Sequence, residues 1–294
     1  MRRVIASSCI LIGAAMPDAF AQDEAKFPFE MIAEAVNVVF GAGDFEKTRA
    51  FYGDLLGLER IPDLDIPGSG PMLRFLAGKS ELKFIVSAGP LPKQAGGRET
   101  ARGIRMLTIY LDERDATLKR LRDAGVDVAN FTGADGEEYM NGFVRDPDDN
   151  EINLVFLPPQ TPRAKNRKLV IHLTVADDEA TQKFYTKLVG LEEITPGMDG
   201  QSRPKFQFQA GPTTIRVSTE NKDLPATPSL HSDSLGMHYI QYVVRDVAAV
   251  REKLIKAGAT ITREPFALGE LATIMFVADP DGIINEFAGP QMKD

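Results

Sequence analysis

The sequence predicts an α+β protein of two tandem domains, each built from two βαβββ modules. Two observations support this. The chain repeats itself at a constant offset of 133 residues, and each copy divides again into halves with the same order of strands and helix. A length of 294 residues leaves room for two hydrophobic cores. The proline-rich segment 158–167 lies between the copies and is expected to be a linker.

The repeat is clearest in two short runs. FYGDLLGLE at 51–59 matches FYTKLVGLE at 184–192, and the FVRDPD segment at 143–148 matches FVADPD at 276–281. Both pairs keep the same offset without a gap, so the copies align over their whole length.

Periodicity and turn residues predict the elements of the first copy. Its first half has a strand at 36–40, a helix at 45–56, and strands at 73–76 and 82–86; its second half has a strand at 107–111, a helix at 115–124, and strands at 143–144 and 152–156. Gly57 and Gly125 follow the two helices, where a C-cap needs a positive φ. The Asp-Pro-Asp segment favours a turn before each last strand.

The N-terminus is typical of a secretory signal peptide, residues 1–21. Arg2 and Arg3 precede a short apolar run at 4–16, and Ala19-Phe20-Ala21 offers small residues for cleavage. Residues 22–30 are then a spacer. Cys9, the only cysteine, lies in the signal, so a mature chain has no disulfide. We therefore expect a periplasmic or secreted protein.

Composition argues against two classes of partner. The net charge is −8 and Lys and Arg form no basic stripe, which disfavours nucleic-acid binding. No later run approaches the roughly 18 apolar residues that cross a bilayer, so no membrane span is expected.

Four segments carry a resemblance to a known superfamily. The sequences at 45–59, 178–193, 143–155 and 276–287 resemble the helix and last-strand signatures of vicinal-oxygen-chelate proteins: glyoxalases, bleomycin-resistance proteins and extradiol dioxygenases. The resemblance covers residues 31–290 and implies domains at 31–157 and 168–290. It also implies that paired modules curl into an open cup, which often holds a divalent metal.

The resemblance places metal ligands on the first and last strands of the modules. The corresponding residues are Asn37 and Val170, Lys83 and Arg216, Met106 and Tyr239, and Asn153 and Glu286. Of these only Glu286 is a usual metal ligand, and lysine or arginine would repel a metal. The first copy is therefore expected to be a metal-free domain that is structural or forms an interface.

The second copy is expected to hold the site, because all three histidines lie in it. Expected catalytic residues are Glu286, His172 and Tyr239; expected substrate-binding residues are Arg216, Gln241 and Thr174. A divalent Fe, Mn, Ni or Zn ion held by His172, Glu286 and His238 is a second interpretation, which requires a bulge at His238. A third is an ion pair between Glu286 and Arg216 that needs no cofactor. His231 is assigned to a loop.

Two functional hypotheses remain open. One is a glyoxalase- or dioxygenase-like enzyme that binds a small carbonyl, enolate or carboxylate compound in the second cup and performs lyase, isomerase or dioxygenase chemistry. The other is a non-catalytic protein that sequesters a small molecule, as bleomycin-resistance proteins do. A homodimer is compatible with either.

Overall fold

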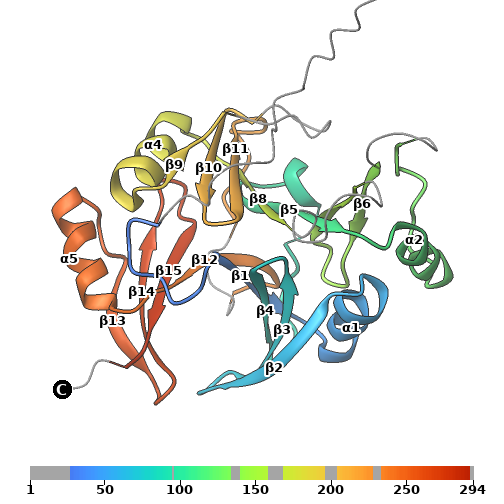
Figure 1. Cartoon of the computed structure of the whole chain (residues 1–294), viewed down its shortest axis with the longest axis horizontal. Helices are drawn as coiled ribbons and strands as arrows, with labels where there is room; N and C mark the ends of the chain where they lie inside the picture. The colour runs from blue at the N-terminus through green and yellow to red at the C-terminus, as the bar shows by residue number, and fades with distance from the viewer. Residues whose placement is uncertain are drawn as a thin grey trace, which may run out of the picture.

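The computed structural model describes residues 27–94, 96–133, 140–157, 168–195, 204–227 and 233–291. It confirms the α+β class, with two curled mixed sheets and few helices (Figure 1). The predicted signal peptide, most of the spacer, the 158–167 linker and His231 lie outside the described residues.

Sheet 1 has eight strands in the order β13-β14-β15-β12-β1-β4-β3-β2. They are β1 (Asn37–Ala42), β2 (Glu59–Ile66), β3 (Gly70–Ala77), β4 (Ser80–Val86), β12 (Gly236–Val243), β13 (Arg263–Leu268), β14 (Ala272–Ala278) and β15 (Ile284–Gly289). The sequence does not predict β2, because five of its eight residues are charged or proline and no apolar alternation remains.

Sheet 2 has seven strands in the order β6-β7-β5-β8-β11-β10-β9. They are β5 (Gly103–Leu111), β6 (Met140–Arg145), β7 (Glu151–Phe156), β8 (Leu169–Thr174), β9 (Glu192–Glu193), β10 (Phe206–Ala210) and β11 (Thr213–Ser218).

Each sheet takes one module from each copy, which corrects the expectation of a cup within the second copy. The strand β1 of the first copy pairs with β12 of the second, and β5 of the first pairs with β8 of the second. The physical reason is that the four modules are alike. Each has an apolar sheet face to bury and a first strand with one unpaired edge. A module can therefore satisfy its edge hydrogen bonds with a partner from either copy.

The helices lie outside the sheets. They are α1 (Phe45–Arg49), which continues as a π-helical turn η1 (Ala50–Leu55), α2 (Arg114–Asp123), α4 (Asp178–Lys183), which continues as η3 (Phe184–Val189), and α5 (Val247–Ala257). Figure 1 shows α4 and α5 on one side of the molecule and α1 and α2 on the other. None of these described helices combines the length and apolar character that a bilayer crossing requires.

Aspartates cap the starts of two helices, and the predicted glycines follow the ends of two helices. The side chains of Asp44 and Asp177 accept hydrogen bonds from backbone N–H groups in the first turns of α1 and α4. Gly57 and Gly125 have φ of 73° and 76°, as expected for residues that end helices.

The Asp-Pro-Asp turns are structural. The Asp146 carboxylate accepts hydrogen bonds from the Tyr52 hydroxyl and from the backbone N–H groups of Asp148 and Asn150. Asp148 in turn accepts from the Gly43 N–H at 3.1 Å, which joins sheet 2 to the end of β1 in sheet 1. The repeated aspartates therefore fasten the two sheets together.

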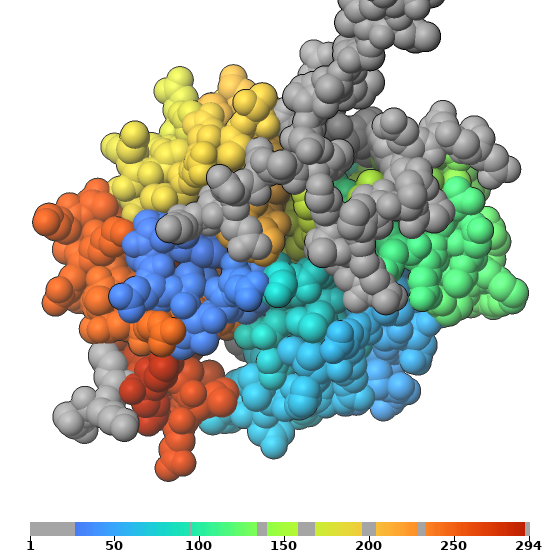
Figure 2. All heavy atoms as spheres, in the orientation of Figure 1, coloured from blue at the N-terminus to red at the C-terminus, as the bar shows by residue number. Residues whose placement is uncertain are grey.

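Residues 27–30, expected as part of the spacer, pack on the last module. The Phe29 ring meets the Phe287 ring edge-on at 5.3 Å, and the Glu30 carbonyl accepts from the Arg245 N–H at 2.8 Å. In Figure 2 this N-terminal segment, in blue, lies against the orange C-terminal module.

Candidate functional site

The predicted site residues are divided between the two sheets. Tyr239, Gln241 and Glu286 stand on β12 and β15 in sheet 1. His172, Thr174 and Arg216 stand on β8 and β11 in sheet 2. The single predicted constellation is wrong, because its two halves belong to modules that pair with different partners. We call the hollow of sheet 1 cup 1 and that of sheet 2 cup 2.

Register shows which residues share the centre of each cup. In sheet 1, Gln241 lies opposite both Asn37 and Glu286. Tyr239 was expected at this central position but lies two residues away from it. In sheet 2, the corresponding central residue is Thr108, opposite Val170 and Asn153, rather than Met106.

The floor of cup 1 is a connected set of buried polar groups. Lys83 Nζ donates to Gln241 Oε1 at 2.6 Å, and Asn37 Nδ2 donates to the same oxygen at 3.1 Å. Gln241 Nε2 donates to Glu286 Oε1 at 3.2 Å. Two residues of the first copy therefore contact Gln241 of the second, which in turn bonds Glu286. Lys83 and Asn37 belong to this site, although the sequence had assigned them to a separate structural domain.

The walls of cup 1 are apolar. They enclose a cavity of about 670 Å³ whose lining includes Val39, Met72, Ile85, Ile274 and Phe276, with Lys83, Gln241, Glu286 and Tyr239 at the polar part. The Tyr239 ring lies 5.4 Å from the Phe276 ring. An apolar hollow with a few convergent polar groups is the usual composition of a small-molecule site.

Burial shifts both ionisable groups of the floor toward their neutral forms. Desolvation raises the pKa of Glu286, although the Gln241 hydrogen bond and the Lys83 charge oppose the rise. Desolvation also lowers the pKa of Lys83, while Glu81 and Glu286 oppose this. Lys83 Nζ lies 3.4 Å from Glu81 Oε2, which is also paired with Arg74 at 2.9 Å.

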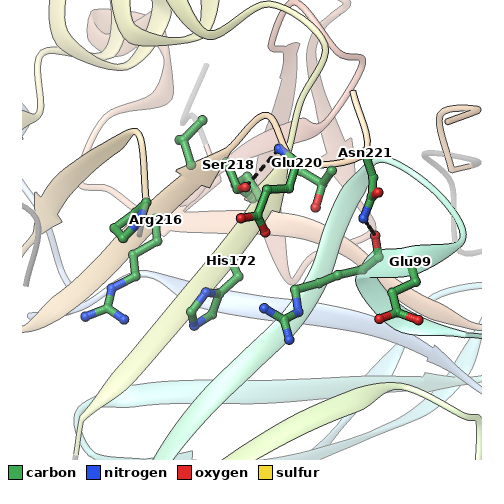
Figure 3. A pocket seen from close by; sticks show the side chains of 11 residues that line it. Glu99, His172, Arg216, Ser218, Glu220 and Asn221 are labelled. Carbon is green, nitrogen blue, oxygen red and sulfur yellow. Dashed lines mark hydrogen bonds between the residues drawn. The ribbon is translucent and has the colours of Figure 1, made fainter. Parts of the chain in front are cut away.

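Cup 2 contains a small polar pocket of about 170 Å³ instead of a large apolar one. Figure 3 shows His172 and Arg216 projecting side by side from β8 and β11, with Ser218, Glu220 and Asn221 above them. Thr174 also lines this pocket. The predicted pair of Arg216 with Glu286 does not form, because Glu286 lies in cup 1; Arg216 Nε instead donates to Gln207 Oε1 at 3.0 Å.

His172 is held as a neutral group in cup 2. Its Nε2 lies 2.8 Å from Thr108 Oγ1, which also accepts from Asn153 Nδ2 at 3.2 Å. Burial lowers the pKa of His172 well below its usual value, and the charges of Arg216 and Arg98 add to this. A histidine beside two guanidinium groups is a poor base and a poor place for a metal cation.

His238 lies at the predicted bulge but not in a cup. The register of β1 and β12 shifts there, so that Val39 faces Tyr239 and Phe40 faces Met237. The His238 ring contacts Ser234 O through Nε2 at 2.9 Å and Gln94 Nε2 through Nδ1 at 3.3 Å. The bulge turns His238 toward the junction between the connections of the two copies.

The predicted metal site of His172, Glu286 and His238 is therefore wrong, since these residues lie in three different places. Within the described part of the chain, no three His, Cys, Asp or Glu side chains gather closely enough to hold a metal ion. The four central groups of cup 1 do not fit a metal either, because one of them is the Lys83 ammonium, which has no lone pair to donate.

Fold and cup define the class of this protein. The chain belongs to the Glyoxalase/Bleomycin resistance protein/Dioxygenase superfamily, whose family profile matches residues 35–154 and 169–287.

Two similar proteins of known sequence are named lactoylglutathione lyases. The chain is 26% identical over 258 residues to a probable lactoylglutathione lyase, chloroplastic, of Arabidopsis thaliana, covering 84% of this chain and 70% of that one. A second lactoylglutathione lyase of the same plant is 25% identical over 272 residues, covering 89% and 93%. Glyoxalase I from Zea mays superposes with a TM-score of 0.62 at 18% identity, covering 87% and 92%, and supports the fold.

Proposed function

We propose that cup 1 binds a small, largely apolar molecule through a carbonyl, enolate or carboxylate oxygen, and that glyoxalase-type proton transfer takes place there. The observation that carries this proposal is the apolar cavity of about 670 Å³ with Lys83 and Glu286 on its floor, where both bond the Gln241 side chain. Arg263, which also lines the cavity, lies over the Phe266 ring at 3.6 Å. The relatives named lactoylglutathione lyases support a carbonyl compound as ligand.

Glu286 is the proposed base. Its carboxylate would take the proton from a hydroxyl-bearing carbon next to a ligand carbonyl, which leaves an enediolate with negative charge on the carbonyl oxygen. The proton would then return to the former carbonyl carbon, while the hydroxyl proton moves to the former carbonyl oxygen. The Gln241 amide holds the carboxylate in place through the 3.2 Å bond. The raised pKa of Glu286 favours this role, because a buried carboxylate accepts protons more readily.

Activity is tested in two assays. The first measures formation of lactoylglutathione from methylglyoxal and glutathione; the second measures deuterium uptake from D₂O next to the carbonyl of aryl ketones, which does not require the lyase substrate. Turnover in either assay that disappears in Glu286→Gln supports the proposal. Turnover that persists in this folded variant would contradict the role of Glu286.

Binding is tested with a matched pair of probes, 2-naphthoate and 2-naphthalenemethanol, by fluorescence titration. The size and apolar lining of cup 1 predict that both bind. Binding without turnover in either assay would select the second candidate function, a non-catalytic sequestering protein. The exposed rim residues Ile32 and Leu271, which line the same cavity, favour this candidate for larger apolar ligands.

We further propose that the chain is exported, on the strength of residues 1–21. N-terminal sequencing of the protein from a periplasmic fraction should begin at Gln22, and an uncleaved Met1 in the cytoplasmic fraction would contradict export.

A further inference from the structure

Four neighbouring strands of sheet 1 each contribute one polar side chain to the centre of cup 1. In the order β15, β12, β1 and β4 these are Glu286, Gln241, Asn37 and Lys83. Carboxylate and amide oxygens are suitable ligands for hard divalent cations. The fourth group, the Lys83 ammonium, is itself a cation. Its charge can neutralise the Glu286 carboxylate, so no metal ion is needed for that purpose.

Lys83 stands on the last of these four strands, and its side chain reaches back to Gln241. Its Nζ lies 2.6 Å from Gln241 Oε1, the oxygen that also accepts from Asn37. The residue is buried, with 7% of its surface exposed, and it borders the cavity. The nearby carboxylates are Glu286 and Glu81, and Glu81 shares its charge with Arg74.

We propose that Lys83 is a built-in cation of cup 1, binding the ligand oxyanion in the place where a divalent metal would otherwise be held and keeping such metals out. This inference rests on the proposed function, because it names what the cup recognises: a ligand with a formal or developing negative charge on oxygen. An ammonium is a compact point charge with three rotatable donors, so it can keep Gln241 and still turn a donor toward the ligand.

The equivalent residue of cup 2 does not serve the same purpose. Arg216 stands 133 residues after Lys83 in the repeat, but its Nε is bonded to Gln207, and its repeat-equivalent neighbours are Val170, Thr108 and Asn153. None of these three can supply a carboxylate. Cup 2 therefore provides a matched control with the same strand geometry and a different set of central groups.

Metal binding by the full mature chain tests the exclusion. Wild-type protein is titrated calorimetrically with MnCl₂, NiCl₂ and ZnCl₂, and its metal content is measured by elemental analysis. We expect no metal at cup 1 in the wild type. Lys83→Glu should gain one equivalent, because the new carboxylate joins Glu286, Gln241 and Asn37. The gain should be lost in the double variant Lys83→Glu with Glu286→Gln.

Two controls separate this result from general metal affinity. Lys83→Met removes the charge without adding a ligand and should bind far less metal than Lys83→Glu; Arg216→Met makes the same change in cup 2 and should gain no metal. One equivalent of metal in the wild type, lost in Glu286→Gln, would overturn the proposal. So would a folded Lys83→Glu variant, verified by circular dichroism, that takes up no metal.

Ligand charge tests the oxyanion role and does not depend on Lys83→Glu folding. In Lys83→Met the affinity for 2-naphthoate should fall about 10- to 100-fold, the worth of one charged hydrogen bond, while that for neutral 2-naphthalenemethanol stays within about twofold. Equal losses for both probes would refute a charge-specific role. If the proposed function itself fails, neither probe binds wild-type protein, which is a distinguishable outcome.

Discussion

Cup 1 and cup 2 are built on the same strands of repeated modules, yet their central groups differ at every position. Where cup 1 has Asn37, Lys83, Gln241 and Glu286, cup 2 has Val170, Arg216, Thr108 and Asn153. Cup 1 opens into an apolar cavity of about 670 Å³, and cup 2 into a polar pocket of about 170 Å³. One fold thus keeps its geometry while the chemistry of its two hollows diverges.

The largest contrast is expected from the last-strand residues. Glu286→Gln should lower proton transfer by about 100-fold or more, the usual contribution of a general base. Asn153→Ala, the matched change in cup 2, should leave the rate within about twofold. Deuterium exchange of a bound ketone measures both. Equal losses in the two variants would show that chemistry is not confined to cup 1.

The second-largest contrast is expected when a larger side chain is placed in each cup and the affinity for a ligand is measured. Ala288 lines the cup 1 cavity, so Ala288→Phe should weaken 2-naphthalenemethanol binding about 10-fold or more by occupying ligand space. Val155 is the repeat equivalent in cup 2, and Val155→Phe should leave this affinity unchanged. Fluorescence titration of both variants with 2-naphthalenemethanol measures these affinities. Weaker binding of this probe by the Val155→Phe variant would place the probe in cup 2.

The polar centres should differ in what they contribute to stability. Gln241 bonds Lys83, Asn37 and Glu286, so Gln241→Leu should reduce the free energy of unfolding by about 2–3 kcal/mol. Thr108 contacts only His172 and Asn153 among the described hydrogen bonds, and Thr108→Val should cost about 1 kcal/mol. Urea unfolding gives both values. The reverse order would mean that the cup 2 network is the more stabilising one.

The smallest contrast is in pH dependence, where the two cups should have opposite signs. The pKa of Glu286 is higher in the folded state, so its stabilising contribution is complete below the unfolded value of 4.5 and is lost as pH rises. The pKa of His172 is lower in the folded state, so its contribution is complete above 6.5 and is lost as pH falls.

Urea midpoints between about pH 4 and pH 8 test these signs. Glu286→Gln should gain stability relative to wild type as pH rises. His172→Gln should gain relative to wild type as pH falls below 6.5. A flat difference for either variant would mean that the group has the same proton affinity in both states.

Local patterns were enough to predict most elements. Each depends on a short stretch: β4 on the residues 82–86, and the end of the first helix on Gly57 with its φ of 73°. The repeat correctly indicated four modules. These features arise within one module, where the sequence holds all the interacting residues.

The site was harder, because it depends on which modules meet. Pairing within or between copies buries the same apolar faces, so no local residue distinguishes the two arrangements. Tyr239 and Met106 were each placed two residues too early along their strands, because the central positions were carried over from the resemblance and not from strand pairing. A signal for Lys83 was present: a cation among the apolar residues of 82–86 requires polar partners. Glu81 on the same strand is one of them, and Gln241 of the other copy is the second.

The pairing of modules across copies makes the chain a covalent counterpart of a symmetric dimer. If it were cut between 157 and 168, each piece would keep two modules, but the inner strand edges of β1 and β5, or of β8 and β12, would lose their partners. Such open edges favour association. Each piece should therefore reassemble with the other, or with a second copy of itself through the repeated sequence, and neither cup would exist in an isolated half.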